Sequence, residues 1–160
     1  MTAEPEILAR LAGGLGLELG FDDDGAITAQ VADGLDVTLD VSRDGSEALM
    51  VCDLGTLDRG DTARNAMLDL LDANPRLAAL GTGTYARDAA SGGVALVGRR
   101  PLVGLDPDRF EAWFGDFVDA ALAGRTVVGL PPMESEAAEY AEERDDFRGI
   151  LSAEALLGLS

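Results

Sequence analysis

The pattern of apolar and polar positions is most regular over residues 61–75, which predict one helix of about four turns. Asp61 or Thr62 can cap its start. Asn74-Pro75 is expected to end it, because proline cannot continue a helix and restricts the residue before it. The apolar arc is wider than the roughly 100° stripe that one packing contact needs. The helix is therefore either a deeply buried core helix, or it contacts its own sheet on one side and a second subunit on the other.

Residues 5–17 begin as a second helix, because apolar side chains recur at i, i+1, i+4 and i+8 along one face. Those four positions are Ile7, Leu8, Leu11 and Leu15. Glycines near the end of the segment weaken the last turn. The apolar face either covers one side of a sheet or helps to grip a partner.

Residues 26–54 alternate between apolar and polar positions and predict a three-stranded antiparallel meander. Asp33-Gly34 is expected to form a two-residue hairpin turn, and residues 43–45 turn the chain again. Residues 48–52 are apolar on both sides. This last strand is therefore expected to be covered on both faces or to lie under a partner.

Residues 81–88 and 93–98 predict a second hairpin, in which Tyr85 is expected to pack. Residues 106–123 predict the last core helix, with Asp106 as its cap and Pro107 at its first position. The element order is helix, three strands, helix, two strands, helix, which indicates an α+β fold with an antiparallel sheet packed against helices.

Leu130-Pro131-Pro132 breaks the pattern, and an acidic stretch with sparse apolar residues follows it. We expect one domain over residues 1–130 and a C-terminal extension over residues 131–160 that is helical or partly mobile.

The composition narrows the class of function. The 160-residue chain has a net charge of −18, and all 12 of its bases are arginine, with no lysine or histidine. Such a charge argues against nucleic acid and anionic membrane surfaces, whose binding needs basic residues, and it permits a basic or amphipathic peptide partner. No apolar run reaches the ~20 residues that span a bilayer, and the N-terminus lacks the features of a signal peptide, so a cytosolic location is expected. The single Cys52 can form no internal disulfide.

The missing residue types also exclude most catalytic chemistry. Without histidine there is no catalytic triad and no imidazole metal site, and without lysine there is no P-loop or Schiff base. The FDDDG sequence at 21–25 fails as a calcium loop, because Gly20 and Val31 stand where acids are needed, and it is expected to be a solvated turn. Asp36 and Asp40 lie about 13 Å apart along one strand, further than the carboxylate pair of a glycosidase. The sequence therefore predicts no enzyme, no metal and no cofactor.

Three stretches carry a resemblance to a known family: 70–74 (LLDAN), the hairpin over 81–97, and 102–121 (LVGLDPDRFEAWFGDFVDAA), with the strands over 35–54 fitting as well. Over residues 7–123 the chain resembles the type III secretion chaperones of the Tir-chaperone (CesT-like) family. The resemblance implies a homodimer of small acidic subunits in the bacterial cytosol. It also implies that the dimer binds the N-terminal segment of a secreted effector and keeps it secretion-competent, without ATP hydrolysis.

The resemblance also implies site residues in two sets. The candidate dimer residues are Met67, Leu68, Leu70 and Leu71. The candidate effector-binding residues, some of which must also serve the monomer core, are Ile7, Leu8, Leu11, Leu15, Val37, Leu39, Met50 and Cys52. Strand addition at a sheet edge would fit this way of binding.

The extension after Pro132 departs from the family, whose members usually end near the last core helix. It is expected to fold over a groove, to contact the secretion machinery, or to have no specific role. The alternative function is that of a YbjN-like regulator, which has a similar layout and also binds proteins.

Overall fold

The structure, a computed structural model, describes residues 3–31 and 34–129. Three helices and six strands follow one another along this part of the chain: α1 (Ala3–Gly13), β1 (Glu18–Phe21), β2 (Ile27–Val31), β3 (Leu35–Val41), β4 (Glu47–Thr56), α2 (Asp61–Ala79), β5 (Thr84–Arg87), β6 (Gly93–Pro101) and α3 (Pro107–Val128). No helix within these residues is both long and apolar enough to span a bilayer.

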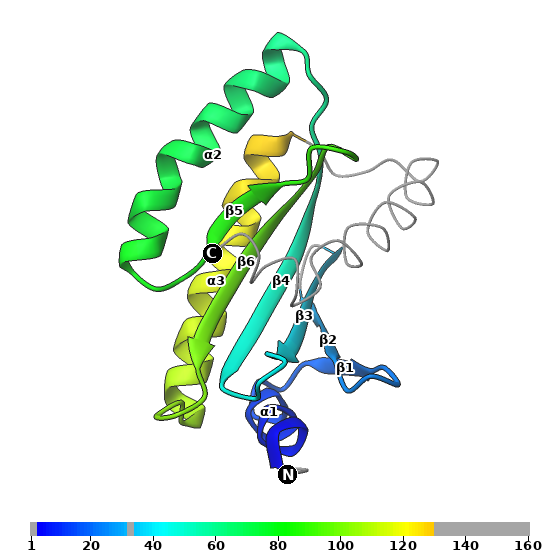
Figure 1. Cartoon of the computed structure of the whole chain (residues 1–160), viewed down its shortest axis with the longest axis vertical. Helices are drawn as coiled ribbons and strands as arrows, with labels where there is room; N and C mark the ends of the chain where they lie inside the picture. Colours follow the sequence, from blue (N-terminus) through cyan, green and yellow to red (C-terminus); the bar gives the residue numbers. More distant parts are fainter. Residues whose placement is uncertain (1–2, 32–33, 130–160) are drawn as a thin grey trace.

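The six strands form one antiparallel sheet in the order β1-β2-β3-β4-β6-β5. Alternation sets the register: Val37 on β3 lies opposite Cys52 on β4, and Cys52 lies opposite Leu96 on β6. All three are fully buried on the same face. Figure 1 shows α3 running along β4 and β6, α1 near the β3 side, and α2 outside β5. The α+β fold predicted from the sequence is confirmed.

The core lies between this face of the sheet and the helices. Its largest fully buried side chains include Phe110, Trp113 and Phe117 of α3, from the helical stripe predicted for this segment. Trp113 donates its Nε1–H to the carbonyl of Thr82 at 3.1 Å, and the guanidinium of Arg100 lies 5.2 Å from the centre of the Trp113 ring. The aromatic face of α3 therefore holds the hairpin of β5 and β6 in place.

The prediction that Asn74-Pro75 ends the central helix is wrong, because α2 continues to Ala79 with Pro75 inside it. Proline removes one backbone hydrogen bond, but tertiary contacts hold the helix on both sides of it. Asn74 bonds its side chain to the backbone N–H and C=O of Tyr85, at 2.7 Å and 3.1 Å. Leu77, beyond the proline, packs against the core.

The start of α2 also differs from the prediction. The cap is Gly60, which makes no side-chain cap, rather than Asp61 or Thr62. Asp58 instead accepts a hydrogen bond from the Gly60 N–H at 2.9 Å. In contrast, α3 begins as predicted, since Asp106 accepts a hydrogen bond from the Arg109 N–H at 2.8 Å.

The sequence pattern missed one strand. β1 turns back on β2 through the predicted FDDDG turn, in which Asp22 accepts hydrogen bonds from Asp24 and Ala26. The meander thus has four strands before α2 rather than three. The turn predicted at Asp33-Gly34 lies partly outside the described residues, as does the extension over 131–160, and Gly34 has a φ of +72°.

Candidate functional site

The outer surface of α2 leaves apolar side chains uncovered. The helix buries Ala63, Ala66 and Leu70 toward β5 and α3. Leu68 and Leu71 are not covered by that contact and are 52% and 60% exposed. Two large leucines on one helix face are more than the monomer core uses, and exposed apolar patches of this kind typically mark interaction sites.

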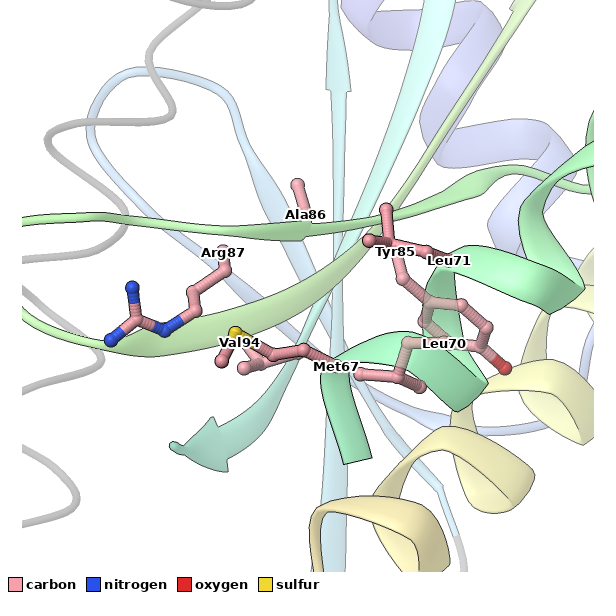
Figure 2. Close-up of a pocket in the computed structure, with 7 residues that line it drawn as sticks. All are labelled: Met67, Leu70, Leu71, Tyr85, Ala86, Arg87 and Val94. Atoms are coloured by element: carbon pink, nitrogen blue, oxygen red, sulfur yellow. The ribbon is translucent and has the colours of Figure 1, made fainter. Parts of the chain in front are cut away.

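An apolar hollow adjoins this helix face, between α2 and the hairpin of β5 and β6 (Figure 2). Its volume is about 100 Å³. Apolar cavities of about 150 Å³ in proteins take up benzene, so a hollow of this size suits one aliphatic side chain. Its lining residues are Met67, Leu70, Leu71, Tyr85, Ala86, Arg87 and Val94.

Hydrogen bonds fix the walls of the hollow. Tyr85 donates its hydroxyl to the carbonyl of Ala120 at 2.7 Å, and burial raises the pKa of this phenol, which keeps it protonated as a donor. Arg87 donates from Nε and Nη2 to the carbonyl of Leu57, at 3.2 Å and 2.9 Å. The guanidinium is therefore held at the rim, away from the apolar side chains (Figure 2). The hollow is a preformed apolar recess.

The four predicted dimer residues differ in how far they are buried. Leu68 and Leu71 are exposed, Met67 is half-buried, and Leu70 is buried beneath the hollow. Met67, Leu70 and Leu71 line the hollow. Tyr85 and Val94 line it with them, and the sequence did not place these two residues in the site.

The predicted effector-binding residues divide by burial. Ile7 and Leu15 are half-buried and lie at the margin of the core. The remaining six are fully or almost fully buried between α1, α3 and the sheet: Leu8, Leu11, Val37, Leu39, Met50 and Cys52. These six support the surface from beneath, so Ile7 and Leu15 are the accessible members of the set.

Sequence reasoning missed the strand that forms one edge of the sheet. β1 pairs with β2 on one side only, and Phe21 at its end is 66% exposed. An edge strand presents free backbone N–H and C=O groups to which an extended peptide can add. The short apolar-flanked turn at 21–25 was the available signal, because such turns often join two strands.

Two carboxylates in turns, Asp44 and Asp88, have lowered pKa values. Within the described part of the chain, no three acidic or cysteine side chains are grouped as a metal site. Hydrogen bonds from Ser46 and Ser42 lower the pKa of Asp44 to about 2, and hydrogen bonds from Ser91 lower that of Asp88. Both carboxylates belong to turns, where they accept neighbouring hydroxyl and backbone hydrogens.

Comparison with known proteins gives a consistent result. The model of the Tir chaperone protein (CesT) family matches residues 6–124. No curated protein matches the chain. Among solved structures, a chain of the ExsC–ExsE complex is 21% identical with a TM-score of 0.60, and the match covers 79% of this chain and 94% of that one.

Two further structures have the same fold. The Yersinia pestis type III secretion chaperone SycH, solved with a stable fragment of YscM2, is 19% identical with a TM-score of 0.57, and the match covers 75% of this chain and 98% of that one. A chain of the heterodimeric ExoU–SpcU complex from the type III secretion system of Pseudomonas aeruginosa is 21% identical with a TM-score of 0.57, covering 78% and 96%.

Proposed function

Since the chain belongs to the Tir chaperone protein (CesT) family, we propose that it is a type III secretion chaperone in the bacterial cytosol. It binds the N-terminal segment of a secreted effector as a homodimer and keeps that segment extended and secretion-competent. The observation that carries the proposal is the family match over residues 6–124, together with apolar surface on α2 and beside α1 that one subunit leaves open. Membership of this family favours a chaperone over a YbjN-like regulator.

The homodimer is proposed to form through the outer face of α2. In a two-fold interface the same patch faces itself, so an exposed leucine of each subunit can enter the hollow of the other. Leu68, 52% exposed, is suited to this role, and Leu71 both lines the hollow and extends the apolar surface around it.

The effector segment is proposed to bind at the other end of the sheet, along α1 and the β1 edge. The accessible apolar side chains there are Ile7, Leu15 and Phe21. An extended effector segment could add to β1 by backbone hydrogen bonds and place apolar side chains beside these three. The net charge of −18 favours a basic segment and should speed its capture.

Binding is proposed to need no ATP hydrolysis. The chain contains no lysine and hence no P-loop. The free energy comes from burial of apolar effector side chains, which offsets the estimated 2–5 kcal/mol or more that ordering a disordered segment costs.

Co-expression tests the proposal directly. The full chain is produced with each candidate effector from the neighbouring genes, and the effector is captured through a C-terminal tag. We expect the chaperone to co-purify with one or a few effectors, and to be lost when the effector lacks its N-terminal segment. Recovery of only free chain with every candidate would overturn the proposal.

Paired variants test the location of the segment. Ile7→Asp and Phe21→Asp should weaken capture, because each places a charge in the proposed apolar path. Val103→Asp is the matched control, since Val103 is 91% exposed in the connection between β6 and α3 and belongs to neither α1 nor β1.

A further inference from the structure

The outer surface of α2 carries opposite charges at its two ends, next to the exposed leucines. Asp61 lies in the first turn and Arg76 in the last, and both are exposed. Arg64 and Asp72 stand three and four residues away from them along the helix, where an ion pair within the helix could form. Neither Asp61 nor Arg76 forms an ion pair with any residue that the structure describes. Their charges are therefore available to a second chain.

Helix geometry places these two charges along one border of the leucine surface. At about 100° per residue, Asp61 and Arg76 lie about 20° and 80° to one side of Leu68. Met67 and Leu71, which line the hollow between α2 and β5, lie about 100° and 60° to the other side. The two charges are about 22 Å apart along the axis, at 1.5 Å of rise per residue. The leucines are thus bordered by an acid near the start of the helix and a base near its end.

Contact of Leu68 with the hollow of a second copy fixes how the two α2 helices align. In antiparallel helices related by a two-fold axis, the numbers of any two facing residues have the same sum. The α2 residues that line the hollow lie between 67 and 71, so this sum is between 135 and 139. Asp61 then faces positions 74–78 of the second copy, and Arg76 is the only charged residue among them.

Parallel packing would set the charges against each other. A two-fold axis along the helices places every residue beside its own copy, so Asp61 would meet Asp61 and Arg76 would meet Arg76. Like charges held close together are unfavourable. Antiparallel packing brings opposite charges together, and in that arrangement the charged borders of the two helices lie on the same side of the interface.

We infer that Asp61 of each subunit forms an ion pair with Arg76 of the other, an inference that rests on the proposed dimer. The two-fold axis repeats the pair at both ends of the leucine surface. A slip by one helical turn would break both pairs, whereas the leucines alone tolerate such a slip, because Leu68 and Leu71 are themselves about one turn apart. Exposed ion pairs add little affinity, and their role here is to select the register and the second copy.

Charge reversal in the full chain tests the pairing by sedimentation velocity. Asp61→Arg and Arg76→Asp each turn the two attractions of the dimer into two repulsions. An exposed pair changes an equilibrium constant by about 1.4- to 5-fold, so each reversal should raise the dimer dissociation constant about 4- to 600-fold. Asp108→Arg is the matched control, because it makes the same change in the first turn of α3, and it should leave the constant unchanged.

Recovery of the dimer separates the pairing from a folding defect. An equimolar mixture of the two single variants restores opposite charges at both ends of the mixed dimer, and so does a chain that carries both reversals. Both samples should dimerise about as tightly as the unaltered chain. Added sodium chloride should shrink the difference between each single variant and the unaltered chain, since salt screens exposed charges.

The outcomes distinguish the pairing from the dimer itself. A dimer that neither reversal weakens would overturn the pairing and leave the proposed dimer in place. Weakening that neither the mixture nor the doubly reversed chain recovers would also overturn the pairing. An unaltered chain that stays monomeric would overturn the dimer and the pairing together, while effector capture is measured separately.

Discussion

Replacing the two exposed leucines of α2 by glutamate, Leu68→Glu with Leu71→Glu, should convert the proposed dimer into a folded monomer. The leucines are 52% and 60% exposed in the single subunit, so about half of each remains to be buried on association. Complete burial of a leucine contributes about 1.5–3 kcal/mol, so half contributes about 0.75–1.5 kcal/mol. A two-fold interface contains four such leucines, and their loss would cost about 3–6 kcal/mol. The dimer dissociation constant should therefore rise about 100- to 20,000-fold, before the repulsion of four added carboxylates is included.

Sedimentation velocity over a concentration series measures this change. The unaltered chain is expected to sediment as a dimer and the double variant as a monomer, with the same circular dichroism spectrum and thermal midpoint measured at a concentration where both are monomeric. Val103→Glu is the control, because it makes the same chemical change at a side chain that is 91% exposed and lies outside α2. A dimer that persists in the double variant, or an unaltered chain that stays monomeric at high concentration, would refute the reasoning.

Three further predictions concern the fold that presents these surfaces. Gly124→Ala should lower the free energy of unfolding by about 1–3 kcal/mol, because its Cβ would collide with Tyr85 and Leu54. Gly115→Ala is the contrast: an added Cβ there meets nothing within 4 Å, so this variant should stabilise α3 by about 0.5–1 kcal/mol. Urea titration of both variants measures the two changes. Asn74→Ala should cost about 1–3 kcal/mol in the same assay, since it leaves the Tyr85 N–H and C=O without their side-chain partner, and an unchanged midpoint would show that this link does not hold α2. The pKa of Asp44, measured by carboxyl NMR, should be about 2, below the ordinary value of 3.8. The contribution of this carboxylate to stability is therefore present above about pH 4 and is lost as the pH falls through about 2. Ser46→Ala should raise this pKa, and an equal pKa in both proteins would contradict the assigned cause.

The regular elements could be predicted wherever local pattern and tertiary packing agree. The alternation over 35–41 gives β3, and Asp106-Pro107 marks the start of α3, because the cap and the first helical position are set by neighbouring residues. Pro75 led to the wrong end for α2, because the rule that proline ends a helix considers only neighbouring residues. The hydrogen bond of Asn74 to Tyr85 and the packing of Leu77 on the core are tertiary contacts, which such a rule does not include. Tertiary contacts outweighed one missing hydrogen bond.

Strand β1 could not be found from alternation. It has only four residues, one of them Gly20, and most of its side chains are exposed. Its place in the sheet comes from pairing with β2 across a tight turn, which leaves little trace in the apolar pattern.

The candidate site was predictable in part. The wide apolar arc of α2 left two alternatives, a deeply buried helix or a helix with a second apolar side outside its own core, and the exposure of Leu68 and Leu71 favours the second. Periodicity gives the angle between residues on a helix but not the direction of the sheet, so it could not separate these two from buried Leu70. The hollow depends on Tyr85 and Val94, which only the folded hairpin brings to α2.

The central claim is that this chain binds an effector segment as a two-subunit chaperone, and the mass of the purified complex tests it most directly. Native mass spectrometry of the chain co-purified with its effector should give two copies of the 160-residue chain and one effector, with no nucleotide bound. A complex with one copy of the chain, or a chain that binds none of the effectors produced beside it, would contradict the account.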